Sequence, residues 1–92
     1  MSARITINMT ADGLFEIWLN EEGRDLLVKE LQALGERSDH FHFGPQETGE
    51  VIVSSIPYRA DDQILEYGKV YFRTDGWDKQ YFPHVLAGER KS

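Results

Sequence analysis

The sequence contains no cysteine among its 92 residues. A chain without thiols forms no disulfide bond, has no thiolate nucleophile and cannot build a cysteine-based zinc or iron–sulfur site. We therefore expect a protein that works in a reducing compartment, and the cytoplasm is the natural assignment.

Basic residues and long apolar stretches are also scarce. Ten Lys and Arg stand against 16 Asp and Glu, which gives a formal net charge of -6. An acidic chain is poorly suited to a phosphate backbone, so we expect no nucleic-acid partner and favour a protein partner of basic character. The first residues, Met1 to Ile5, form no charged leader before an apolar run. We accordingly expect neither a signal peptide nor a membrane span, and no membrane partner.

The residues that are present suffice for one folded domain. Apolar residues make up 40% of the chain and aromatic residues 12%. A chain of this length buries roughly 60 to 70% of its unfolded surface, which supports one two-layer core. We expect a single domain over residues 1–92, in which residues 88–92 form a frayed tail.

The alternation of apolar and polar residues over 5–9 and 15–19 predicts a β-hairpin. A two-residue turn would mix the two faces, whereas a three-residue loop with Gly13 in the left-handed conformation keeps them apart. The second register pairs apolar residues across the hairpin: Met9 with Phe15, Ile7 with Ile17 and Ile5 with Leu19.

A helix is predicted next, with Asn20 as its N-cap and leucines at 27, 31 and 34 on one face. It should run for about four turns and end at a left-handed Gly35. Gly23 lies in its first turn, where the sequence offers no reason for a glycine. Further strands are expected at 40–43, 51–53 and 64–73, the last with a bulge at Gly68, followed by a turn at 74–76 and a short helical or irregular segment over 77–86.

The predicted fold is therefore α+β, an antiparallel sheet of order ββαβββ along the chain with one amphipathic helix on one face. The apolar side chains of the hairpin and of Phe41 and Phe43 should face that helix. The opposite face would then have no cover, and functional residues are expected there. It carries Thr6, Asn8, Glu16, Trp18, His40 and His42.

The residues of this face allow two interpretations. His40 and His42 project from the same side of a strand, and they chelate a metal if Asp39, Glu16 or His84 joins them. The alternative is a solvated or partner-facing surface. No nucleophile elbow or phosphate-binding loop is present, and paired carboxylates such as Asp61 and Asp62 are usually solvated, so we expect no enzyme and no cofactor.

Aromatic residues indicate a binding surface more strongly. Tyr67 and Tyr71 share a strand parity with Lys69 and Arg73, and with Trp18 they make a composition enriched in protein interfaces. Alternatively, Trp18 and the tyrosines pack beneath residues 77–86, or the open face is buried in a homodimer. The candidate partner-binding residues are Glu16, Trp18, His40, His42, Asp61, Asp62, Tyr67 and Tyr71.

Five segments together resemble the thirty-second family of predicted bacterial immunity proteins of polymorphic toxin systems. They are Glu16–Leu27, Ser38–His42, Leu65–Val70, Trp77–Asp78 and Tyr81–Leu86. The resemblance implies a small α+β protein, encoded beside a toxin, that binds and neutralises the toxin domain in the cytoplasm without catalysis and without a cofactor. It identifies the segments and not the residues that contact the toxin.

Overall fold

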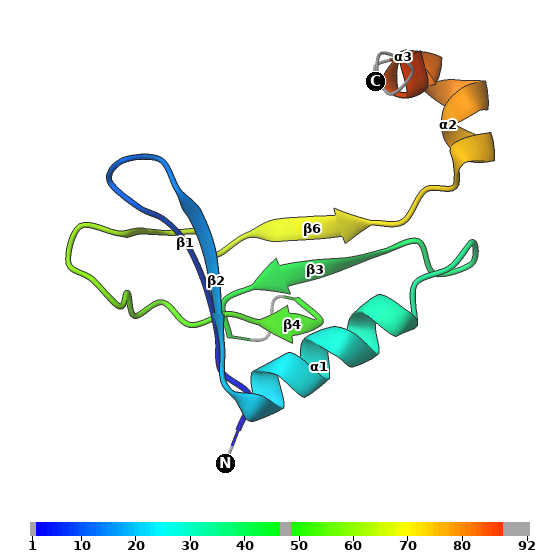
Figure 1. Ribbon diagram of the computed structural model, residues 1–92. Helices are drawn as coiled ribbons and strands as arrows, with labels where there is room; N and C mark the ends of the chain where they lie inside the picture. Colours follow the sequence, from blue (N-terminus) through cyan, green and yellow to red (C-terminus); the bar gives the residue numbers. More distant parts are fainter. Residues whose placement is uncertain (1, 47–48, 88–92) are drawn as a thin grey trace.

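The computed structural model describes residues 2–46 and 49–87, which form six strands and three helices (Figure 1). The predicted tail over 88–92 lies outside the described residues. In chain order the elements are β1 (Ile5–Met9), β2 (Phe15–Leu19), α1 (Glu21–Gln32), β3 (His40–Gly44), β4 (Val51–Ile52), β5 (Gln63–Ile64), β6 (Gly68–Tyr71), α2 (Asp75–Tyr81) and α3 (Pro83–Ala87).

The β1–β2 hairpin has the predicted register. Met9 pairs with Phe15 and Ile5 with Leu19, and Gly13 adopts a φ of 91° in the loop. Only the three-residue loop keeps the apolar residues of both strands on one face, so the alternation of the sequence was sufficient to fix this register.

Helix α1 begins as predicted and ends earlier. The side chain of Asn20 accepts hydrogen bonds from the backbone N–H groups of Gly23, at 2.7 Å, and of Arg4, at 2.8 Å. The helix ends at Gln32 with Ala33 as its C-cap. The prediction of a left-handed cap at Gly35 is wrong, because Ala33 already closes the last turn on Lys29 and the Gly35 N–H donates instead to the Ser38 carbonyl.

The strands form two sheets and not the single antiparallel sheet that the sequence predicts. The orders are β2-β1-β5 and β4-β3-β6, and β4 runs parallel to β3. The expected long strand over 64–73 is divided because its two halves pair with different partners, β5 with β1 and β6 with β3. Gly68 therefore opens β6 and is not a bulge.

The core is small and lies where the two sheets meet. Its buried apolar side chains, among the described residues, are Ile5, Ile7, Phe41, Val51 and Val53. Leu26 and Leu27 of α1, and Leu34 just beyond its end, pack against this cluster. Leu31, predicted on the same face as Leu27 and Leu34, is instead 46% exposed.

The face of the hairpin that was expected to be open is covered over β1, so this part of the prediction is wrong. Thr6 and Asn8, expected on an open face, are 1% and 0% exposed. They lie beneath the segment over 54–62, whose Tyr58 ring stacks on Trp18 at 4.0 Å. The sequence gives that polar segment no covering role, which is why the prediction failed.

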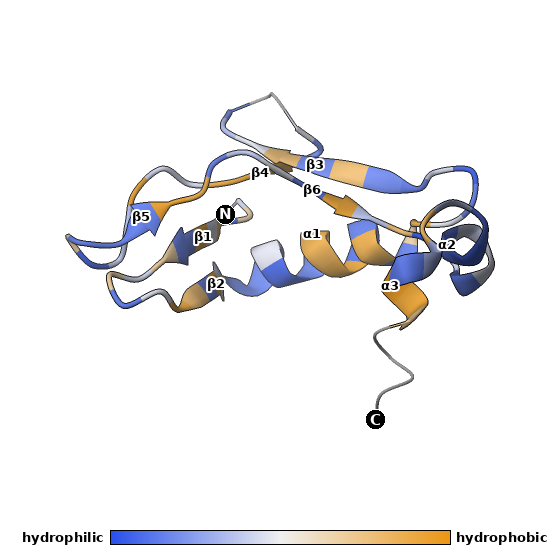
Figure 2. Cartoon of the chain, turned by 90° about the horizontal axis from the view of Figure 1, so that it is seen from above, coloured by the Kyte–Doolittle hydropathy of each residue, from blue (hydrophilic) through white to orange (hydrophobic). Residues whose placement is uncertain are grey.

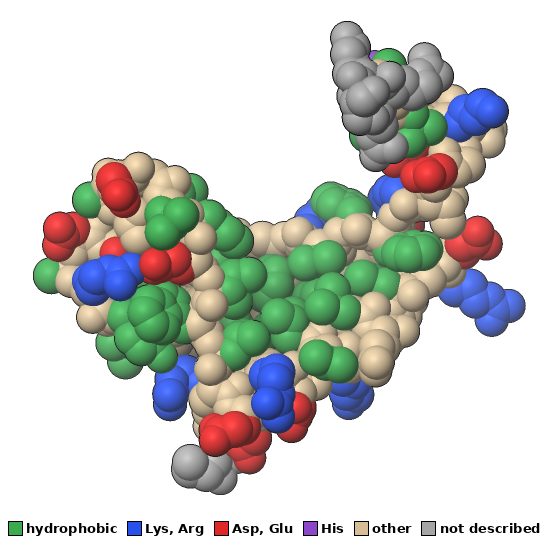
Figure 3. Space-filling model, viewed as in Figure 1, with side chains coloured by type: hydrophobic (Ala, Val, Ile, Leu, Met, Phe, Trp, Pro, Cys, Tyr) green, Lys and Arg blue, Asp and Glu red, His purple; other side chains and the backbone are tan. Residues whose placement is uncertain are grey.

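The side of the hairpin that was expected to be core is buried over β1, where Ile5 and Ile7 lie in the core, but is open over β2. Phe15, Ile17 and Leu19 of β2 are 53%, 45% and 40% exposed. Figure 3 shows hydrophobic side chains continuing from β2 across the upper flank of α1 to β6. We call this surface the apolar face, and define it by the exposed side chains of Phe15, Ile17, Leu19, Leu31 and Phe72.

The chain after β6 forms an arm, residues 74–87, that contains α2 and α3. Thr74 is the N-cap of α2 and accepts a hydrogen bond from the Trp77 N–H, so the turn predicted at 74–76 is the first turn of a helix. Figures 1 and 2 show the arm projecting from the end of the molecule that lies away from the β1–β2 loop. It does not lie over Trp18, whose ring stacks on Tyr58, so the alternative in which Trp18 packs beneath residues 77–86 is wrong.

None of the helices within the described ranges is both long and apolar enough to cross a membrane.

Candidate functional site

The outer side of the β3–β6 pair carries an exposed group of aromatic and charged side chains. Alternation along the strands turns Phe41 and its partner Val70 towards the core, and the neighbouring positions therefore point outwards. The register places His40 opposite Tyr71 and His42 opposite Lys69. We call these four residues the histidine face.

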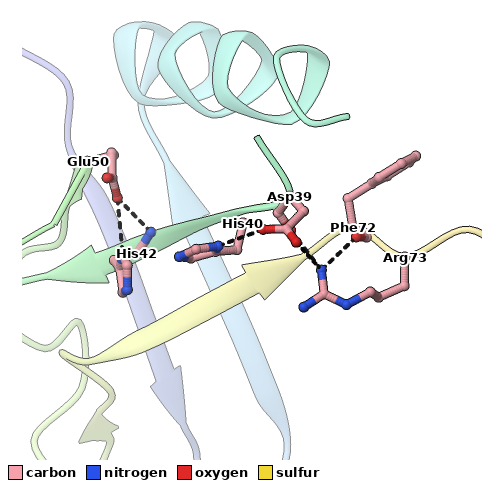
Figure 4. A network of polar contacts seen from close by, with 6 residues as sticks. All are labelled: Asp39, His40, His42, Glu50, Phe72 and Arg73. Atoms are coloured by element: carbon pink, nitrogen blue, oxygen red, sulfur yellow. Dashed lines mark hydrogen bonds and ion pairs between the residues drawn. The ribbon is translucent and has the colours of Figure 1, made fainter. Parts of the chain in front are cut away.

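Each histidine is held by a carboxylate (Figure 4). His40 Nδ1 lies 2.9 Å from an Asp39 oxygen, and His42 Nδ1 lies 3.3 Å from Glu50 Oε1. The same Glu50 oxygen accepts the His42 backbone N–H at 2.8 Å, which lowers the pKa of the Glu50 carboxyl group. The hydrogen bond to His40 and the charge of Arg73 likewise lower the pKa of Asp39. Both carboxylates therefore stay ionised in mildly acidic solution and fix the orientation of the imidazole rings.

An arginine closes one end of the histidine face. Arg73 Nη1 lies 2.9 Å from Asp39 Oδ2 and donates to the Phe72 carbonyl at 2.9 Å (Figure 4). Its guanidinium group lies 5.0 Å from the centre of the Tyr71 ring and 4.5 Å from that of Trp77. Cation–π contacts of this kind orient the tyrosine without burying it, and Tyr71 remains 55% exposed.

Among the described residues, the structure places no third metal ligand beside His40 and His42. His40 and His42 are neighbours, with ring centres 5.0 Å apart. Glu16 lies in the other sheet and His84 in the arm. Asp39 contacts His40 and is itself paired with Arg73. Over residues 2–46 and 49–87, no group of three or more His, Asp or Glu side chains is placed to hold a metal ion.

Trp18 and Glu16 belong to a separate cluster that fastens the 54–62 segment to the hairpin. Trp18 Nε1 donates to Asn8 Oδ1 at 2.8 Å, and Asn8 Nδ2 donates to Glu16 Oε1 at 3.1 Å. Arg59 pairs with Glu16 and lies over the Trp18 ring at 5.5 Å. These contacts satisfy the buried amide of Asn8, so Trp18 and Glu16 have a structural role here.

The roles of Tyr58 and Arg59 were missed by the sequence interpretation. They stand in a segment of polar residues without periodicity, and no local pattern indicates that a loop will cover a strand face. The only available signal was the need of a buried asparagine and a tryptophan for hydrogen-bonding and stacking partners.

The remaining candidate residues are dispersed. Asp61 is exposed in the loop. The Asp62 side chain is only 2% exposed and pairs with Arg59 Nε at 3.3 Å, so it holds the loop and is not presented to a partner. Tyr67, 75% exposed, lies just before β6 beside Phe15 and Phe43, at the groove in the apolar face.

Acid is expected to destabilise the hairpin cluster. The hydrogen bond from Asn8 and the contact with Arg59 lower the pKa of Glu16. A carboxyl group whose pKa is lower in the folded state stabilises the fold above its ordinary pKa, and this contribution is lost as the pH falls through the lowered pKa. The free energy of unfolding should therefore decrease as the pH falls below about 4.3.

Urea denaturation of Glu16→Gln over the same pH range measures this contribution. The variant should be less stable than the parent at pH 7 and should lose less stability in acid. Ile56→Ala, which removes an exposed side chain without a titratable group, is the control and should leave the pH profile unchanged. Parallel profiles for the parent and Glu16→Gln would contradict the assignment.

In comparisons with family models, curated proteins and solved structures, no match to the chain was found.

Proposed function

We propose that this protein is a cytoplasmic immunity protein, which binds a cognate toxin domain and neutralises it without catalysis. The observation that carries the proposal is the histidine face. It exposes orientated aromatic and charged side chains that the core does not need.

The composition and rigidity of this face support protein binding. Tyr71 is flanked by Lys69, whose Nζ lies 5.6 Å from the ring centre, and by Arg73. Tyrosine and arginine are enriched among the residues that dominate binding energy, and a side chain that is already orientated loses less entropy on binding. Asp39 and Glu50 place two carboxylates beside these groups, where a basic partner can reach them.

The charge of the chain and its resemblance to immunity proteins support the same partner. A net charge of -6 favours encounter with a basic protein, and a toxin that acts on nucleic acid needs a basic surface. The resemblance spans the segments that contain β2, the start of α1, His40, His42 and the arm.

Binding to a toxin domain encoded in the same locus tests this proposal. We expect Tyr71→Ala to raise the dissociation constant about 30-fold or more, because truncation of a central aromatic residue typically has this effect. His42→Ala should weaken binding as well. Surface plasmon resonance at several salt concentrations separates this loss of contact from electrostatic steering, which acts on the association rate.

Ile56→Ala is the matched control, since Ile56 is 74% exposed and lies on the segment that covers the hairpin. It should bind like the parent. If the parent protein forms no complex with the toxin, the proposed function is wrong. If Tyr71→Ala and His42→Ala both bind like the parent, the histidine face is not the contact surface.

A further inference from the structure

The apolar face leaves an unusually large hydrophobic surface uncovered for so small a chain. Phe15, Ile17 and Leu31 are each 45 to 53% exposed. Between Phe15 and Phe43 the surface is hollowed into a groove of about 180 Å³. Contiguous apolar surface of this kind is rare on monomers and marks an interaction site.

The arm presents a second uncovered apolar surface. Tyr81, Phe82 and Val85 are 56%, 47% and 50% exposed. Helices α2 and α3 pack on one another, and the Trp77 ring contacts Tyr81 and Phe82 of the same arm. Helices of seven and five residues are too short to be stable in water on their own, so the arm needs a surface to pack against.

The size of the molecule indicates how much surface is left to cover. The accessible surface is 6946 Å², whereas a compact monomer of 10.6 kDa exposes about 5,500 Å². The radius of gyration is 15.6 Å, against about 12 Å for a compact domain of this length. The excess, on the order of 1,000 Å² per chain, matches what each copy buries in a stable homodimer.

The root of the arm directs it away from the apolar face of its own chain. The Phe72 N–H donates to the Asp39 carbonyl at 2.7 Å, and Arg73 pairs with the Asp39 side chain while its guanidinium lies over Trp77. An arm that folded back would have to move Trp77 away from Arg73. A second copy of the chain can meet the arm where it stands.

We propose that the protein is a homodimer in which the arm of each copy packs on the apolar face of the other. The contact is reciprocal, as two-fold symmetry requires, and each copy contributes both surfaces. His40, His42 and Tyr71 lie on the side of the β3–β6 pair opposite to the core-facing Phe41 and Val70, so this dimer contact does not require them. The dimer and the proposed function can therefore fail independently.

Sedimentation equilibrium of the full chain tests the dimer. We expect twice the 10.6 kDa mass of one chain. Val85→Asp on the arm and Leu31→Asp on the apolar face should each raise the dissociation constant of the dimer about 100-fold or more, because each substitution damages both reciprocal contacts. Ile56→Asp, which alters an equally apolar but remote position, should leave it unchanged.

A mixture of the two variants distinguishes a dimer with two reciprocal arm contacts from other arrangements of the two chains. Val85→Asp with Leu31→Asp should form a mixed dimer that keeps one undamaged contact, so association is partly restored. Far-UV circular dichroism of each variant verifies folding. Val85 lies in the arm, outside the core cluster, and its variant provides a valid result even if Leu31→Asp does not fold.

Disulfide trapping identifies which chain the arm contacts, and the absence of native cysteine makes it specific. Chains carrying both Leu31→Cys and Val85→Cys should cross-link into dimers on oxidation. A monomeric chain at all concentrations, a dimer that survives Val85→Asp, or a disulfide formed within one chain would each overturn the proposal.

Discussion

Phe41→Ala is expected to lower the free energy of unfolding by about 3 to 5 kcal/mol, as aromatic truncations in a packed core do. Phe41 is 2% exposed and contacts the Phe43 ring, with centroids 5.5 Å apart. The core has few other buried side chains to compensate for the cavity. Because a domain of this size has a total stability of about 5 to 14 kcal/mol, the variant loses a large fraction of it.

Urea denaturation followed by tryptophan fluorescence measures this loss. Ile56→Ala removes an exposed apolar side chain and should change stability by about 0.5 kcal/mol or less. An equally small change for Phe41→Ala would show that the two sheets do not share the core described above.

Gly23→Ala is expected to destabilise the protein by about 1 to 3 kcal/mol, the usual cost of overpacking. Helix propensity alone predicts the opposite sign, a gain of about 1 kcal/mol at an interior position. A Cβ at residue 23 would overlap the Arg4 carbonyl oxygen and come within 3.0 Å of Ile5, because the first turn of α1 lies directly on β1. The glycine is therefore required by a close approach between elements.

Gly35→Ala provides the matched control for that substitution. A Cβ there would meet no atom within 4 Å, and the residue does not have a positive φ. Thermal unfolding should show a lower melting temperature for Gly23→Ala and an unchanged or higher one for Gly35→Ala. A gain in stability for both variants would contradict the close packing of α1 on β1.

The sequence predicted those elements whose pattern is local and long. The hairpin register followed from five-residue alternations, and the start of α1 followed from the Asn20 cap. The division into two sheets could not be predicted, because β4 and β5 have only two residues each and are set by pairing at long range. The C-terminal end of α1 was misplaced because Gly35 is a turn residue outside the helix.

The candidate site was predicted only in part, because some of its residues follow a local pattern and others depend on contacts at long range. Alternation placed His40 and His42 on one side of a strand and Tyr71 beside Lys69 on another, but the pairing of β3 with β6 that brings them together was not predicted. The separation of Trp18 from this group depends on Tyr58 stacking over it from a loop 40 residues away in the chain, and no local pattern contains that contact. Phe15, Ile17 and Leu19 were predicted to be core, because an exposed apolar surface and a buried one contain the same types of residue.

Inhibition of the toxin by purified protein tests the central claim most directly. With the toxin domain encoded in the same locus, we expect its activity to fall linearly with added protein and to vanish at one protein chain per toxin. Tyr71→Ala should require more protein at the same toxin concentration. Full toxin activity in the presence of excess parent protein, or an inactivation that continues at catalytic amounts of it, would contradict a neutralising binding protein.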